Sequence, residues 1–80
     1  MSANLPGLAK ELAMALVDSP DEVEVITSGD SEYVKLELEV AEDDLGRVIG
    51  RSGRTARALR TILSAAADKN GQRCSLDIVE

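Results

Sequence analysis

The stretch Tyr33–Val40 is the feature that most constrains the fold of this chain. Its apolar residues are Val34, Leu36, Leu38 and Val40, and they alternate with Lys35, Glu37 and Glu39. Such alternation is typical of a strand with one buried face and one face in water. Upstream, Val23 and Val25 alternate with acidic residues in the same way, and residues 28–31 have turn chemistry. These patterns predict an antiparallel hairpin over about 22–40, whose apolar face needs a cover.

Segments with helical spacing flank the hairpin and can supply that cover. Residues 4–18 predict a helix capped by Asn4, in which Leu8, Leu12 and Leu16 recur every four residues. Residues 41–69 predict a short helix, a loop at Gly50–Gly53 and a longer helix that Asn70-Gly71 ends. Residues 73–79 alternate again and predict a last strand.

The order of elements is therefore α-β-β-α-α-β in one domain over residues 1–80. A strand that returns after a helical crossover is expected to run parallel to the strand before it. We expect an α/β (α+β) two-layer sandwich, with a three-stranded mixed sheet covered by helices on one face.

The charge of the chain is unevenly distributed. The net charge is −6, yet five arginines and no acid lie between Leu45 and Thr61. The other 63 residues hold four basic and fifteen acidic side chains. A concentrated basic patch matters more than the total charge for binding a polyanion.

Several functional classes lack the residues they need. The chain has no histidine, and its one cysteine, Cys74, cannot form an intrachain disulfide and is expected to point into the core. Glu42-Asp43-Asp44 do not converge on one metal ion, because consecutive helical residues diverge by about 100°; their expected role is to favour the helix N-terminus. We therefore expect no enzyme, no metal, no cofactor, no small-molecule substrate and no membrane span, in a cytoplasmic setting.

The loop Gly50-Arg51-Ser52-Gly53 has the chemistry of a phosphodiester cradle. Glycines let a ligand approach the backbone closely, and the helix that follows presents unpaired N–H groups and its positive dipole end. A nucleotide-binding P-loop would need Gly-Lys-Ser/Thr, which is absent. On its own, a GxxG pattern also fits a plain helix C-cap before a turn.

The stretch Gly46-Arg47-Val48-Ile49-Gly50-Arg51-Ser52-Gly53 resembles the signature of KH domains, whose GxxG loop clamps about four nucleotides of a single strand. The element order is similar to the type II arrangement. Residues 49–62 further resemble the bacterial KhpA-like family of small KH-domain RNA-binding proteins. Many KH domains have a large aliphatic residue where this chain has Ala56.

The resemblance implies a set of RNA-binding residues. The backbone-contacting positions map onto Gly50, Arg51, Ser52 and Gly53, and the groove is expected to be walled by Val48, Ile49 and apolar residues of the second strand. From their positions, Arg54 and Arg47 are further candidates for phosphate contact. Arg60 lies about two turns along the helix and is expected to be solvated or paired with an acid.

The last helix carries a wider apolar arc, roughly 200°, than the roughly 100° that a core needs. This excess predicts a dimer packed through Ala58, Ile62 and Ala65, although alanine is also a common surface residue. The resemblance implies pairing with itself or with a larger KH-containing protein of the KhpB (Jag) type.

The function expected from these observations is single-stranded RNA binding through Gly50–Gly53, in a post-transcriptional regulator or RNA chaperone. The alternative is a KH-fold dimerisation module with weak or partner-dependent RNA binding.

Overall fold

The computed structural model describes residues 4–80, and the first three residues of the expected domain lie outside it. The helices are α1 (Leu5–Leu16), α2 (Leu45–Ile49) and α3 (Arg54–Lys69). The strands are β1 (Glu24–Gly29), β2 (Tyr33–Glu39) and β3 (Arg73–Ile78). The expected α+β fold with a three-stranded mixed sheet is confirmed.

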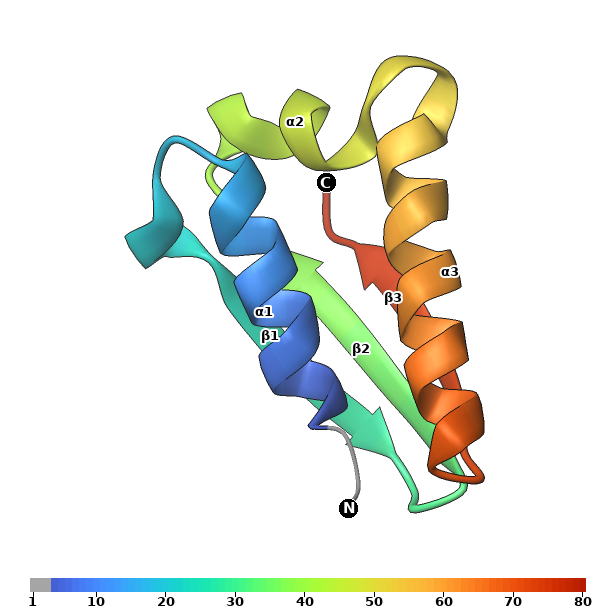
Figure 1. Cartoon of the computed structure of the whole chain (residues 1–80). Coiled ribbons are helices and arrows are strands. Elements are labelled where there is room, and N and C mark those ends of the chain that lie inside the picture. Colours follow the sequence, from blue (N-terminus) through green and yellow to red (C-terminus); the bar gives the residue numbers. More distant parts are fainter. Residues whose placement is uncertain (1–3) are drawn as a thin grey trace.

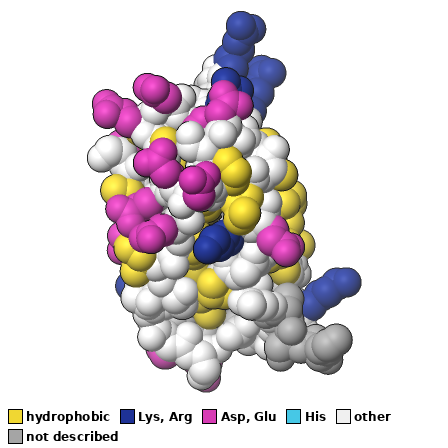
Figure 2. All heavy atoms as spheres, turned by 90° about the vertical axis from the view of Figure 1, so that its left-hand side faces the viewer, with side chains coloured by type: hydrophobic (Ala, Val, Ile, Leu, Met, Phe, Trp, Pro, Cys, Tyr) yellow, Lys and Arg dark blue, Asp and Glu magenta, His cyan; other side chains and the backbone are white. Residues whose placement is uncertain are grey.

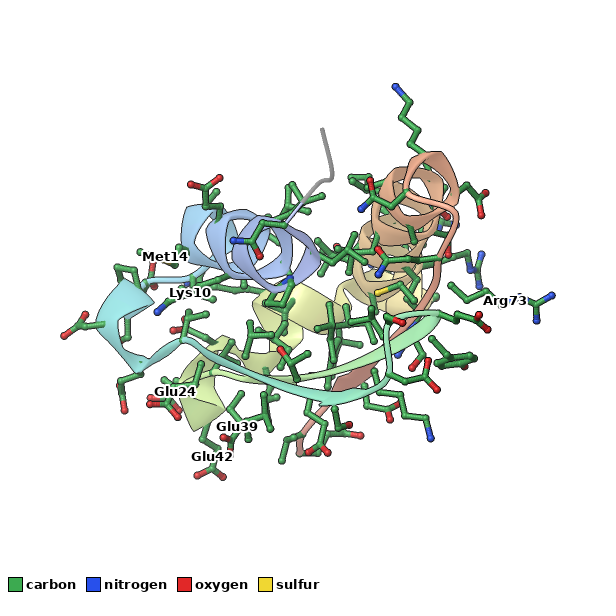
Figure 3. The ribbon with its side chains drawn as sticks, turned by 90° about the horizontal axis from the view of Figure 1, so that it is seen from below. Lys10, Met14, Glu24, Glu39, Glu42 and Arg73 are labelled. Atoms are coloured by element: carbon green, nitrogen blue, oxygen red, sulfur yellow. The ribbon has the colours of Figure 1, made fainter. Side chains whose placement is uncertain are left out.

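The sheet has the strand order β1-β2-β3 (Figure 1). β1 pairs with β2 in antiparallel register, with Val25 opposite Leu38. β2 pairs with β3 in parallel register, with Leu36 opposite Leu76. Figure 3 shows α1 and α3 on the same side of the sheet, so the molecule has two layers.

The core lies between the sheet and these helices. Its largest fully buried side chains are Leu36 and Leu38 of β2, Val48 of α2 and Leu63 of α3. β2 has its apolar face covered as its alternation predicts, while Lys35 and Glu37 stay exposed on the other face.

The buried stripe of α1 differs from the leucine stripe expected there. Leu5, Ala9 and Ala13 are buried, whereas Leu16 is 38% exposed. Leu8 and Leu12 are only partly buried and pack at the border of the core. Because alanine has a small side chain, this orientation lets the backbone of α1 approach the sheet closely, with the leucines along its flanks.

The ends of the helices differ by a few residues from the expected ranges. The Oδ1 atom of Asn4 accepts a hydrogen bond from the Gly7 N–H at 3.0 Å, which is the expected cap of α1. α1 ends at Leu16, and Pro20–Glu22 forms a separate 3-10 turn. Another 3-10 turn, Glu42–Asp44, precedes α2, so the helix expected from residue 41 starts at Leu45.

The turn between β1 and β2 is held by the side chain of Asp30. Its Oδ1 atom accepts hydrogen bonds from the N–H groups of Tyr33 at 2.9 Å and Glu32 at 2.8 Å. These bonds, that of Tyr33 first, favour the ionised carboxylate and lower the pKa of Asp30 below its ordinary value of 3.8. Asp30 thereby fixes the hairpin that carries the sheet.

Candidate nucleic-acid interface

The GxxG loop, residues Gly50–Gly53, connects α2 to α3 at one end of the molecule (Figure 1). The Gly50 N–H donates to the Gly46 carbonyl at 2.9 Å and so ends α2. The Gly53 N–H donates to the Gly50 carbonyl at 3.1 Å and closes a tight turn. Ser52 and Gly53 both have positive φ angles, of 57° and 72°. The loop is thus a compact turn between two helices.

Gly50 is required by both its backbone angles and its surroundings. It has φ 77° and ψ 171°, a combination that is essentially restricted to glycine. A Cβ atom there would lie 2.8 Å from the backbone nitrogen of Thr55. The close approach of the loop to the first turn of α3 therefore depends on a residue without a side chain at this position.

The first turn of α3 meets the loop without a side-chain cap. Gly53 occupies the N-cap position, and no side chain accepts a hydrogen bond from the helix N-terminus there. The Arg54 N–H donates to the Arg51 carbonyl, while the positive dipole end of the 16-residue helix faces the space around the loop. Such an end is favourable for a phosphate group.

Arg51 and Arg54 add positive charge at the same end. Both side chains are exposed, and within residues 4–80 the recorded ion pairs involve neither of them. Figure 2 shows basic side chains projecting at the upper end of the molecule and acidic side chains gathered over the face below. The structure thus brings Gly50, Arg51, Ser52, Gly53 and Arg54 together as one basic, accessible surface.

Arg47 differs from these two arginines because it is already paired. Its Nη2 atom lies 2.8 Å from Oδ2 of Asp18, and its Nε atom lies 3.4 Å from Oδ1 of Asp44. In this structure Arg47 links α2 to the segment that follows α1. The expectation that it contacts phosphate has no support in this geometry.

Asp44 is the buried acceptor at the centre of that link. Its side chain is 2% exposed and accepts hydrogen bonds from the backbone N–H groups of Asp18 and Ser19, each at 3.1 Å. Asp44 is the N-cap residue of α2 but makes no side-chain bond to that helix. The expected role of this carboxylate is to favour the N-terminus of its own helix. The carboxylate instead accepts hydrogen bonds from the segment that follows α1.

The expected groove walls need correction. Val48 is 0% exposed and lies in the core, so it offers no surface to a ligand. The apolar residues of the second strand, Val34, Leu36 and Leu38, are buried beneath the helices as well. Ile49 is partly buried and remains available beside the loop. Ala56, where many KH domains carry a larger residue, is 4% exposed and fills a core position.

Arg60 makes a contact that the sequence pattern did not indicate. Its Nε atom donates a 3.0 Å hydrogen bond to the backbone carbonyl of Leu76 in β3. Arg60 is exposed, which agrees with the expectation that it is solvated, and the bond to a backbone carbonyl is additional to that expectation. No residue type signals a carbonyl at a sheet edge, so only the placement of α3 beside β3 could have revealed this contact.

The residues expected at a dimer interface lie on the outer surface of α3. Ala58, Ile62 and Ala65 are exposed, and Ile62 is 44% exposed. Leu59 and Leu63 on the same helix are buried in the core. The wide apolar arc thus divides into a buried half and an exposed half.

The acidic residues, Cys74 and the helices are the candidates for a metal site, a buried thiol and a membrane span. Within residues 4–80, no three His, Cys, Asp or Glu side chains are grouped in a way that could hold a metal ion. Cys74 is partly buried rather than fully in the core, and burial raises the pKa of its thiol. None of the helices in this part of the chain has the length and apolar character needed to cross a membrane.

Comparison with known families gives a match over almost the whole chain. Residues 7–78 match the KH domain of KhpA/KhpB. The RNA-binding protein KhpA of Halalkalibacterium halodurans is 49% identical over 73 residues, which cover 91% of this chain and 96% of that protein. The protein of the same name from Leifsonia xyli is 51% identical and covers 81% of this chain and 83% of its own length.

A solved structure shares the fold at lower sequence identity. A crystal structure of an Aquifex aeolicus Era variant superposes with a TM-score of 0.66 over 92% of this chain and 29% of that protein. The sequences are 20% identical. This likeness supports the arrangement of the helices and strands.

Proposed function

Because the chain belongs to the KhpA/KhpB family of KH domains, we propose that it binds single-stranded RNA by gripping the phosphate backbone with the GxxG loop. The family is one of RNA-binding KH proteins and not an enzyme family. The observation that carries the proposal is the N-terminus of α3, which has no side-chain cap, next to two exposed arginines, Arg51 and Arg54, that form no ion pair within residues 4–80.

Each part of the loop has a distinct task in this proposal. Gly50 brings the loop against Thr55 in the first turn of α3, so that the loop backbone lies at the positive end of that helix. Arg51 and Arg54 neutralise phosphates, while Ser52 adds a small hydrogen-bonding group. Ile49 supplies apolar contact to a neighbouring base. Arg47 is given no phosphate contact in this proposal, because it forms ion pairs with Asp18 and Asp44.

The grip of one loop on about four nucleotides gives modest affinity and little sequence discrimination. Such binding suits a post-transcriptional regulator or RNA chaperone in the cytoplasm, which contacts many RNAs briefly. Avidity from a second domain would strengthen it. The exposed face Ala58, Ile62 and Ala65 supports pairing with a second copy or with a larger KH protein of the KhpB type.

A double substitution, Arg51→Asp with Ser52→Asp, tests the phosphate grip. It reverses charge at the loop while leaving the core intact, so we expect RNA crosslinking to be abolished and the thermal unfolding midpoint to be retained. The matched control is Lys10→Asp with Ser31→Asp, which makes the same change in charge at two exposed positions away from the loop. The control is expected to crosslink nearly as well as the unchanged protein.

The dependence of binding on salt is the second readout. If Arg51 and Arg54 each neutralise one phosphate, the logarithm of the association constant should fall with the logarithm of salt concentration with a slope of about 1.4. Crosslinking that survives in the loop variant would overturn the phosphate grip. The protein-interaction module, with RNA binding supplied by a partner, would then be the better account.

A further inference from the structure

The outer edge of β3 presents backbone groups to which the sheet gives no partner. β3 is the last strand in the order β1-β2-β3. The N–H groups of Arg73 and Val79 donate to carbonyls of the β2 side, Glu32 at 2.8 Å and Leu38 at 2.9 Å. Because backbone groups alternate in direction along a parallel strand, the N–H and carbonyl of Leu76 point away from β2.

Arg60 of α3 reaches this free edge, which runs alongside the helix (Figure 1). Its Nε atom donates to the Leu76 carbonyl at 3.0 Å, so one end of the guanidinium is fixed while the side chain stays exposed. The bond restricts a long side chain that otherwise moves freely. A fixed guanidinium loses less entropy when a ligand binds to its remaining donors.

The donors that remain on Arg60 are the Nη1 and Nη2 groups. Within residues 4–80, the recorded ion pairs leave this arginine without an acid partner. These two nitrogens form a planar fork that matches two neighbouring hydrogen-bond acceptors. The side chain therefore presents a preformed, donor-only fork at the junction of α3 and β3.

The surface beside this fork is hollow. A depression of about 440 Å³ is lined by Arg57, Arg60, Thr61, Ser64, Ala65 and Asp68. The carboxylate of Asp68 makes the hollow less favourable for a phosphate than for an uncharged base. Arg60 lies six residues after Arg54, which is about 9 Å along the helix axis. It also lies about 120° around the helix from Arg54, so an RNA strand held at the GxxG loop would have to follow α3 toward β3 to bring a base to it.

We propose that Arg60 forms a base-reading subsite that selects a base with two adjacent acceptors. Guanine offers O6 and N7, and cytosine offers O2 and N3. Adenine and uracil place a donor next to each acceptor on their accessible edges, so they leave one Nη group unpaired. This inference rests on the proposed RNA binding and adds a base preference to it.

The test compares Arg60→Lys with the unchanged protein. The probes are octauridylate and three derivatives in which one central uridine is replaced by guanosine, cytidine or adenosine. Each bidentate pair discriminates by roughly 1–3 kcal/mol, so we expect the guanosine or cytidine strand to bind about tenfold more tightly than the other two. Arg60→Lys keeps the charge but lacks the fork, and its four affinities should agree within about twofold.

Two controls keep the result interpretable. Arg73→Lys changes an exposed arginine that does not line the hollow and should retain the preference. In a strand with 7-deazaguanosine, the guanine analogue lacks N7. If guanine is the base that Arg60 reads, this strand should bind more weakly than the guanosine strand. If cytosine is the base that is read, the cytidine strand shows the preference instead. Arg60→Gln repeats the measurement if Arg60→Lys lowers the unfolding midpoint.

The outcomes separate the inference from the function on which it rests. Equal binding of all four strands by the unchanged protein would overturn the base-reading subsite while RNA binding stands. If Arg60→Lys lowers the affinity for all four strands equally and leaves the base preference unchanged, Arg60 contacts phosphate. That result would also overturn the base-reading subsite. If none of the four strands binds the unchanged protein, the proposed single-stranded RNA binding is itself wrong.

Discussion

Gly50 and Gly53 bracket the same loop, but different physical constraints act on them. Gly50 has backbone angles that other residues avoid, and Thr55 fills the space where a Cβ would lie. Gly53 has the left-handed angles φ 72° and ψ 16°, and open space surrounds its missing Cβ. Ser52 shows that this loop tolerates a non-glycine residue with positive φ.

This difference predicts unequal costs for two alanine substitutions. Gly53→Ala should destabilise the fold by about 1 kcal/mol, which is the usual cost of left-handed angles for a residue with a side chain. Gly50→Ala adds a steric conflict and should cost about 3 kcal/mol. Urea denaturation of both variants measures the difference. Equal midpoints would contradict the close packing of Gly50 against Thr55.

Among the elements, α2 is the shortest helix and depends on contacts outside itself. It has five residues, too few to be stable alone. Val48 fixes it in the core, and the link from Arg47 and Asp44 joins it to Asp18 and Ser19. Since α2 leads directly into the GxxG loop, this link also fixes the position of the loop.

Removing the buried acceptor should therefore be costly. Asp44→Ala leaves the N–H groups of Asp18 and Ser19 without their partner, and we expect a loss of about 3 kcal/mol in the free energy of unfolding. Asp43→Ala, one residue earlier and exposed, is the control and should change it by less than about 0.5 kcal/mol. A thermal melt of each variant decides the matter. If the thermal unfolding midpoint of Asp44→Ala is close to that of the control, Asp44 does not hold α2 in place.

The order of elements could be predicted from the sequence because strand and helix periods differ clearly along the chain. The buried face of α1 could not, because its leucines and its alanines both recur every four residues and either stripe satisfies the pattern. The loop residues were identified from residue types alone. The roles of Arg47 and Arg60 could not be predicted in this way, because Asp18 and the Leu76 carbonyl, with which they pair, come from segments far away in the sequence.

At the scale of the whole molecule, charge is divided between two surfaces. On the open face of the sheet, Glu24 lies opposite Glu39, and Glu37 lies opposite Asp77. Figure 3 shows Glu24, Glu39 and Glu42 projecting on the side away from the helices. Like charges opposite each other are destabilising. In the proposed function, this acidic face would repel RNA and direct binding to the end that carries the GxxG loop.

The outer face of α3 leads to a prediction about assembly. If Ile62 packs against a second copy, Ile62→Glu places a charge in that contact, and the mass from light scattering should fall from twice the 8.5 kDa of one chain to a single chain. Ser64→Glu, on another side of the same helix, should leave the pair intact. A strict monomer of the unchanged protein at high micromolar concentration would count against self-pairing.

The bond between Arg60 and the Leu76 carbonyl has a consequence for solubility. An edge strand with free backbone groups is a template on which another chain can add a strand, and this is a common start of aggregation. Arg60 occupies the Leu76 carbonyl with a charged side chain. The same bond that orients the Arg60 guanidinium therefore hinders the addition of another strand at the edge of β3.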